Sequence, residues 1–166
     1  MAYTKTNTNV FTGLITGVSI GGAQVGWTGN LVTISVATET TKVTGGQSHT
    51  AIATNQKSKD YQLTFSLREY SMESLAIALG QASSAVTNSG SSLTITGTAS
   101  ANVAIIFEVL NEQNNKYIRF NLPVCKFAGA GSVPFDSENQ GDMQVTFDVI
   151  DSSGVMTAWI LAATGW

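Results

Sequence analysis

Alternation of apolar and polar residues predicts strands along most of the chain. The stretch LVTISVA at 31–37 alternates strictly, with Val, Ile and Val separated by Thr and Ser. A period of two is typical of a strand with one buried face and one wet face. We expect this strand to continue through 40–44 after a kink near Thr38 and Glu39.

The same period returns at 61–67 and 142–151, where Leu, Phe and Val alternate with Gln, Thr and Ser. Residues 45–60 are polar and without period, which predicts a long loop. Two matched strands on either side of that loop indicate an extended hairpin. Further strands are expected near 10–20, 93–98, 103–110, 117–124 and 156–163.

One segment changes to helical period. Ser71 is a suitable N-cap, and Met72, Leu75, Ala76 and Leu79 follow the spacing of a single helix face. Gly80 stands where a left-handed C-cap belongs. The pattern predicts a helix over 71–80 whose apolar stripe packs on the outside of the sheet.

The length of 166 residues fits a single domain over 1–166 with a core of its own. Residues 1–9 are rich in Thr and Asn, and we expect a flexible N-terminal arm over 1–12. Many short strands and one helix predict an all-β fold with one short α-helix, arranged as a β-sandwich or barrel.

The amino-acid composition limits the classes of function that the chain could have. Charged residues are only 11%, and polarity is carried by Thr (21) and Ser (17). Hydroxyls cost less to bury than ions, so such a surface suits a protein that covers its exterior with copies of itself. A net charge of −3, with Lys and Arg scattered along the sequence, argues against binding to nucleic acid. No apolar run is long enough for a membrane span and no secretory signal is visible, so we expect a soluble protein that does not contact membranes.

Two motifs could suggest catalysis. Residues 17–21 match the G-x-S-x-G nucleophile elbow, but that motif requires a strand-to-helix turn, and a glycine turn followed by a strand is expected here. His49 is the only histidine and lies in the polar segment. We therefore expect no enzyme and no catalytic residue.

The other candidate sites are equally weak. Asp136, Glu138 and Asp142 do not have the spacing of a calcium loop. Cys125 ends an apolar strand and is expected to be a buried structural thiol, although neighbouring Lys126 leaves a reactive thiol conceivable. We expect no metal and no cofactor.

Three ordered stretches resemble phage tail tube proteins, also called major tail proteins. They are LVTISV…VTGGQS at 31–48, LTFSLREYSMESLAIALG at 63–80, and YIRFNLP at 117–123 followed by GSVPFDS at 131–137 and QVTFDVID at 144–151. In that family an apolar strand ending in Glu leads into a short helix closed by Gly. The likeness runs over about residues 10–160 but does not extend to the Thr-rich N-terminal arm or the apolar C-terminal strand.

The resemblance implies a virion structural protein that self-assembles as hexameric rings stacked into a helical polymer, the hollow tail tube. Neighbouring sheets would join into one lumen wall. The tube would carry a tape-measure protein and genomic DNA without sequence-specific binding, through to DNA ejection. Initiator, terminator and possibly sheath proteins would be its other partners. The subunit would lie in the tail of the bacteriophage particle, and in the host cytoplasm before assembly.

The resemblance and the alternation together give candidate positions. Polar positions expected to face the lumen, or the opposite wet side, are Thr33, Ser35, Gln62, Thr64, Ser66, Gln144, Thr146 and Asp148. Arg68 is the exceptional cation, with Glu39 or Glu69 as expected partner. Inter-ring contacts are expected at Thr4, Asn7, Phe11, Gln47, His49, Asn55, Lys57 and Trp166.

Two alternatives stay open. One is a related part, namely a terminator or the tube of a phage-like contractile injection device. The other is a carbohydrate-binding β-sandwich, which needs aromatic side chains exposed on one sheet face. Trp27, Trp159 and Trp166 are its candidates, although Trp159 lies in an apolar strand typical of a core.

Overall fold

The computed structural model describes residues 13–25, 28–44, 51–97, 100–111, 115–130, 133, 141–150 and 156–163. Nearly all of its regular elements are strands, joined in antiparallel pairs. The strands are β1 (Gly13–Ile20), β2 (Ala23–Val25), β3 (Thr28–Thr44), β4 (Ala51–Leu67), β5 (Val86–Thr87), β6 (Ser92–Leu93), β7 (Val103–Asn111), β8 (Lys116–Ala130), β9 (Met143–Val149) and β10 (Thr157–Leu161). The described helices are α1 (Met72–Ala78) and a 3-10 turn, η2 (Ser83–Ala85). The predicted fold class is confirmed.

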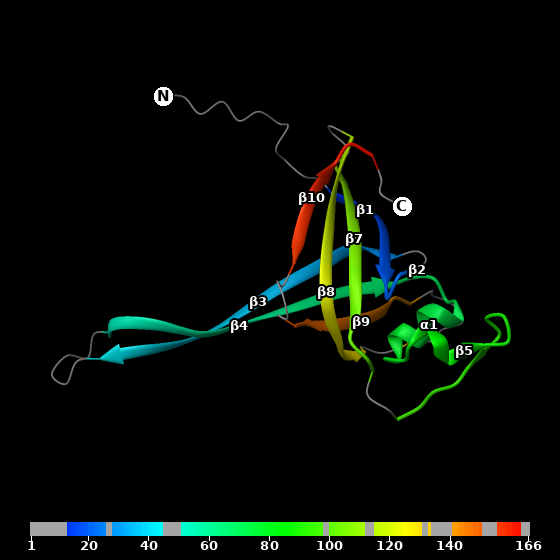
Figure 1. The fold of residues 1–166 in the computed structure, drawn as a ribbon, viewed down its shortest axis with the longest axis horizontal. Helices are drawn as coiled ribbons and strands as arrows, with labels where there is room; N and C mark the ends of the chain where they lie inside the picture. Colours follow the sequence, from blue (N-terminus) through cyan, green and yellow to red (C-terminus); the bar gives the residue numbers. More distant parts are fainter. Residues whose placement is uncertain are drawn as a thin grey trace.

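The strands form two layers that share β8. In one layer β2, β1, β7 and the first part of β8 lie side by side, with β10 on the far side of β8. In the other, the last part of β8 is followed by β9, β4 and β3. The layers cross rather than align (Figure 1). This is the arrangement of an orthogonal β-sandwich.

β8 passes from one layer to the other at a bulge. Tyr117–Asn121 pair with β10, whereas Cys125–Ala130 pair with β9. The register against β7 shifts between Leu122 and Cys125, and Pro123 lies inside this shift. Proline has no N–H to donate, so a bulge is one of the few places where an inner strand tolerates it. The bulge bends β8, so that its two parts lie in different layers of one eight-stranded sheet.

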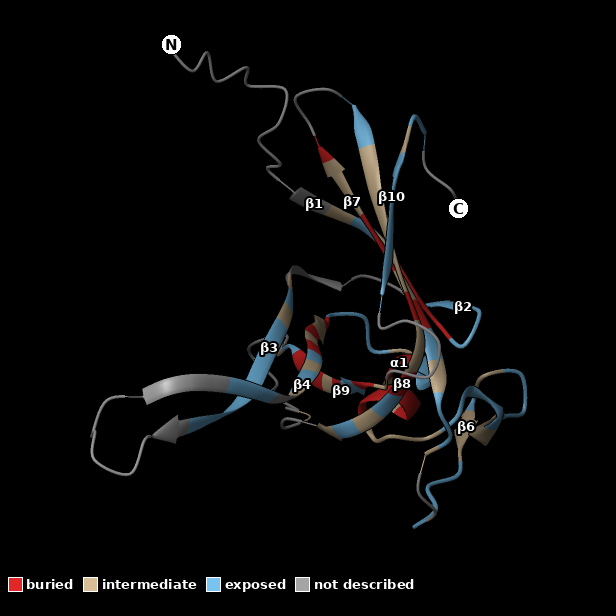
Figure 2. Cartoon of the chain, turned by 60° about the vertical axis from the view of Figure 1, so that its left-hand side comes forward, coloured by how far each residue is buried: buried red, intermediate tan, exposed pale blue. Residues whose placement is uncertain are grey.

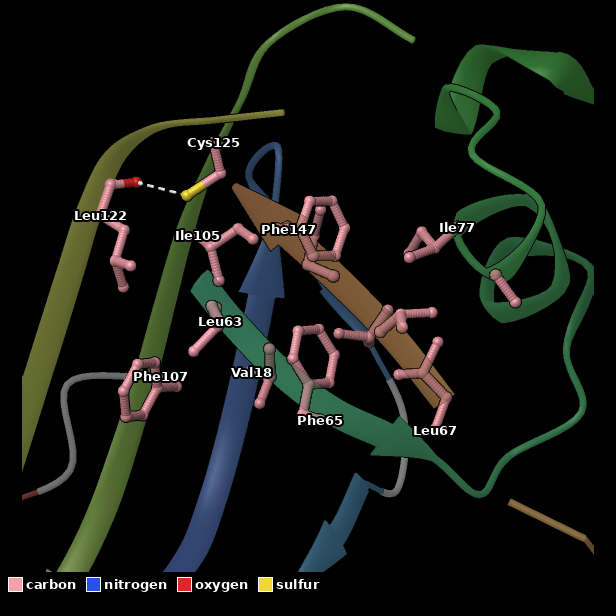
Figure 3. Packing of buried hydrophobic residues seen from close by; sticks show 14 of the residues in the cluster. Val18, Leu63, Phe65, Leu67, Ile77, Ile105, Phe107, Leu122, Cys125 and Phe147 are labelled. Carbon is pink, nitrogen blue, oxygen red and sulfur yellow. Dashed lines mark hydrogen bonds between the residues drawn. The ribbon is translucent and has the colours of Figure 1, made fainter. Parts of the chain in front are cut away.

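The core fills the space between the layers (Figure 3). Phe65 and Phe147 stack with centroids 6.0 Å apart, and Phe127 meets Phe147 edge-on at 5.7 Å. β9 shows the predicted alternation, with its odd-numbered residues buried and its even-numbered ones exposed or partly exposed. Burying each such apolar side chain contributes about 1.5–3 kcal/mol. The fully buried side chains at the centre are Leu63, Leu67, Ile105, Leu122, Met143 and Val145.

The long hairpin is confirmed, but its loop is shorter than predicted. Residues 51–60, expected to be loop, belong to β4 and pair with β3. Residues 45–50 lie outside the described part of the chain. The loop prediction was wrong because Thr, Asn, Lys and Ser show no alternation when both faces of a strand are wet. The predicted kink near Glu39 is confirmed by a register shift between Glu39 and Thr40.

The strand predicted at 93–98 is mostly absent. Only Ser92–Leu93 form a strand, paired with Val86–Thr87. Beyond it, the side chain of Gln81 takes the place of a neighbouring strand at Thr96. Its amide nitrogen donates to the Thr96 carbonyl at 3.1 Å, and its amide oxygen accepts from the Thr96 N–H at 3.2 Å. The Gln81 side-chain amide therefore makes the two backbone hydrogen bonds of Thr96 that a neighbouring strand was expected to make.

Helix α1 is capped as predicted. The Ser71 hydroxyl accepts from the Ser74 N–H at 3.1 Å. At the other end the Gln81 N–H donates to the Ala76 carbonyl and the Gly80 N–H to the Ile77 carbonyl, which is a Schellman motif.

The buried face of α1 shares only Ala76 with the predicted stripe. Its buried residues are Ser74, Ala76, Ile77 and Ala78. Met72 is exposed, and Leu75 and Leu79 are only partly buried. Ile77 points toward Phe147 in the core, so the helix closes one end of the sandwich (Figure 3). The small residues Ser74 and Ala78 let the helix approach closely, a packing preference that a hydrophobic stripe does not reveal.

A buried ion pair lies between β7 and β8. Glu108 has none of its side chain exposed, and its Oε1 accepts from Arg119 Nε at 2.8 Å. The two residues are register partners across the ladder. A buried carboxylate needs such a partner because an uncompensated charge is costly to desolvate.

Gly80 offers a test of the helix packing. Its φ is +67°, and a Cβ there would lie 2.6 Å from Cδ1 of Phe127. Gly80→Ala should lower the free energy of unfolding by about 1–3 kcal/mol, from backbone strain and overpacking. Urea unfolding measures this. Gly97→Ala is the matched control, since nothing lies within 4 Å of its Cβ position. Equal midpoints for the two variants would contradict the packing.

Candidate functional site

The polar residues predicted to line a lumen come together on one face. They are the outward residues of β3, β4 and β9, on the side of the sheet away from the core. Figure 2 shows buried residues alternating with more exposed ones along β4 and β9. We call this surface the polar face. Its members are Thr33, Ser35, Gln62, Thr64, Ser66, Gln144, Thr146 and Asp148, all exposed or partly exposed.

Side chains on the polar face form cross-strand rows. Thr64 lies opposite Thr146, and their hydroxyls are 3.2 Å apart. In the next row Gln62 Nε2 donates to Asp148 Oδ1 at 2.9 Å, and Ser35 lies opposite Gln62. Two pairs of outward side chains therefore bond across the β4–β9 ladder, on a face of hydroxyl, amide and carboxylate groups.

Charges on this face occur beside opposite charges. Lys126 of β8 is the register partner of Asp148, a neighbour that the sequence analysis did not identify. At the end of the face Arg68 Nε donates to Asp142 Oδ1 at 3.0 Å. Asp142 is thus a partner of Arg68 that the sequence analysis did not name. Because Asp142 precedes β9, only the β4–β9 pairing brings it to Arg68.

Most of the predicted inter-ring positions lie outside the described residues. Two of these positions are among the described residues. Asn55 is exposed in β4. Lys57 is the extra residue of β4 at the bulge opposite Glu39 and Thr40. The positions outside are Thr4, Asn7, Phe11, Gln47, His49 and Trp166.

The G-x-S-x-G stretch belongs to a strand end, as the sequence analysis expected. Ser19 lies in β1 with 5% of its surface exposed, and Gly21 and Gly22 form the turn to β2. No helix follows it, so the backbone of a nucleophile elbow is not formed here.

An apolar cleft opens where the layers diverge. It has a volume of about 180 Å³ and lies between β10 and the β3–β4–β9 side of the sandwich. Its lining residues are Ile34, Tyr61, Leu122, Val149 and Met156. Two further apolar residues of these strands are exposed, Val36 of β3 at 53% and Ile160 of β10 at 67%.

Trp159 corrects another expectation. It was interpreted as a core residue, but on the edge strand β10 it is 44% exposed. Trp27 and Trp166, the other two candidates for a sugar platform, lie outside the described residues. The part of the chain that the structure describes thus offers one exposed indole.

The described ranges contain no cluster of three or more His, Cys, Asp or Glu residues that could hold a metal ion. Among the helices in these ranges, none has the length and apolarity to cross a membrane. Asp142 is engaged with Arg68, whereas Asp136 and Glu138 lie outside the described residues.

Comparisons with known proteins show the fold. No protein-family model matches the chain, and no curated protein matches it by sequence. Among solved structures, the chain is similar to the sheath/tube terminator of an extracellular contractile injection system in its extended state. The TM-score is 0.50 at 12% identity, covering 88% of this chain and 92% of that one. The likeness therefore extends over nearly the whole of both chains.

Cys125 is predicted to be an inert thiol. It is fully buried, and burial raises its pKa from 9.0 to about 12. Ellman's reagent at pH 8 should label it only after unfolding.

The raised pKa also makes stability depend on pH. The contribution of this thiol to the free energy of unfolding is fully present below pH 9. It falls between pH 9 and 12, because there the unfolded thiol ionises and the folded one does not. Cys125→Ala should lose less stability over that interval. Rapid labelling of the native protein would contradict the assignment.

Proposed function

We propose that this chain is a ring-forming structural subunit of a phage-type tail or contractile injection device. It belongs to the tube or to the terminator that ends it. The observation that carries the proposal is the polar face, a continuous array of neutral or charge-balanced groups across β3, β4 and β9. The similarity in fold to a sheath/tube terminator supports the same class of protein.

The chemistry of the polar face suits the wall of a channel. Hydroxyls and amides that bond to one another keep the surface wet without providing a row of cations. Binding to phosphates depends on Lys and Arg, and the two cations here lie beside Asp148 and Asp142. DNA or a tape-measure protein could therefore pass along such a surface without being held.

The edges of this layer suit joining to further copies. Within the described residues β3 ends the strand order and has β4 as its partner along that edge. An open edge of this length favours pairing with another chain unless something covers it. In a ring, this layer of one subunit could pair with the same layer of the next subunit. Such pairing would remove the open edges and form one continuous wall from several subunits.

Tube and terminator differ in how far assembly continues. The fold comparison favours a terminator-like component, which forms one ring, while a tube protein adds hexameric ring upon ring. In either case the partners are further copies, tail initiator or sheath proteins and the lumen contents, and the location is the tail of a virion or similar particle.

Negative-stain microscopy of the purified protein, at high concentration and over a range of salt, tests the proposal. Stacked tubes are expected for a tube subunit and single rings for a terminator. Light scattering that finds only monomers under all these conditions, and also after a tail initiator complex is supplied, would contradict both. A monomer that binds on a glycan array would instead favour the carbohydrate-binding alternative, with Trp159 as the first residue to replace.

A further inference from the structure

A groove runs between the end of α1 and the segment that follows β6. Its volume is about 430 Å³, and it lies in the part of the molecule where α1 and β5 are side by side (Figure 1). Two stretches of chain form its walls, one just after α1 and one between β6 and β7. We call it the α1 groove, and its described lining residues are Gly80, Gln81, Ala82, Ser84, Ala85, Thr94, Thr96, Ser100 and Ala101.

A smaller cavity continues from the α1 groove into the core. Its volume is about 40 Å³, and it shares five lining residues with the groove, namely Gly80, Gln81, Ala82, Ser100 and Ala101. An apolar cavity of about 150 Å³ can hold benzene, so this one has room only for a small aliphatic group. Its remaining lining residues are all apolar: Ile20, Ile77, Val103, Phe127 and Phe147.

The lining disfavours most classes of ligand. The described residues around both hollows include no charged side chain, so nothing there would compensate a buried phosphate, carboxylate or ammonium group. Those of the groove itself include no aromatic side chain on which a sugar or a base could stack. The exposed hydroxyls of Ser84, Thr94 and Thr96 can bond to a ligand. A neutral, hydrogen-bonding ligand with one small aliphatic branch matches this lining.

The α1 groove already binds one amide, that of Gln81. Its Nε2 donates to the Thr96 carbonyl at 3.1 Å and to the Leu79 carbonyl at 3.3 Å. Its Oε1 accepts from the Thr96 N–H and hydroxyl, each at 3.2 Å. The two bonds to the Thr96 backbone are those that a residue of an antiparallel strand would make. A peptide group could make the same two bonds if the Gln81 side chain turned away.

We propose that the α1 groove binds an extended, uncharged peptide segment of a partner protein, with one small aliphatic side chain anchored in the cavity. A peptide group of that segment replaces the Gln81 amide at Thr96. This is strand addition, in which backbone hydrogen bonds give affinity and the cavity selects the side chain. The inference goes beyond the proposed function, because binding in the groove requires no ring.

A short peptide tests the site. The probe is an acetylated and amidated pentapeptide with valine at its centre and serine or threonine elsewhere. Ligand-observed saturation-transfer NMR measures its Kd on monomers and on assemblies alike. We expect a millimolar Kd, with transfer strongest to the valine methyl groups. The same peptide with aspartate at its centre should bind at least tenfold more weakly, because a carboxylate cannot enter an apolar cavity uncompensated.

Two variants of the chain should change the affinity in opposite directions. Gln81→Ala removes the competing amide and should bind the valine peptide about tenfold more tightly. Ala101→Phe narrows the opening that the two hollows share and should weaken binding at least tenfold. The matched control is Ala162→Phe, at an exposed alanine that lines neither hollow, and it should bind like the parent. Circular dichroism should show every variant folded.

Three results would each overturn the inference. They are no saturable transfer from the parent protein, equal binding of the valine and aspartate peptides, and an affinity that neither rises in Gln81→Ala nor falls in Ala101→Phe. If Gln81 served only to stabilise the fold, Gln81→Ala would lower the free energy of unfolding and leave the peptide affinity unchanged. None of these results depends on assembly, so the proposed function is decided by microscopy alone.

Discussion

The structure depends on one strand, β8, that belongs to both layers of a single bent sheet. β8 pairs with β7 and β10 in its first part and with β9 in its last, and the change occurs at the bulge around Pro123. A proline there is tolerated because the ladder is already broken. Everything else follows from that bend. The two layers cross, their apolar faces meet, and α1 closes one end of the space between them.

The bend also creates surfaces that the core does not use. Because β10 and β9 leave β8 on the same side but in different layers, an apolar cleft opens between them. The same divergence lets β3 and β4 continue past β9 into solvent. A chain that had to be stable alone would cover exposed apolar residues such as Val36 and Ile160, and also the part of the β3–β4 hairpin that extends beyond β9. The surfaces are understandable if further copies of the chain cover them.

The polar face and the core are two sides of one set of strands. Every second residue is buried in β9 and in the part of β4 from Leu63 to Leu67, and the residues between them include the hydrogen-bonded pairs Gln62 with Asp148 and Thr64 with Thr146. A register slip by one residue would exchange the two sides and put apolar groups on the wet face. The register that packs Phe65 against Phe147 is thus also the one that builds the candidate site.

The sequence by itself determined which residues lie inside and outside each alternating strand, since strand geometry is local and has a period of two. It therefore predicted the polar face, the caps of α1 and the kink near Glu39. It could not predict the strand at 51–60, where both faces are wet and no alternation exists. Tertiary structure alone decided that Arg68 meets Asp142, that Trp159 is exposed on an edge, and that Gln81 replaces a strand at Thr96. Each of these depends on which distant segments lie side by side, and that is decided by the packing of the two layers around β8.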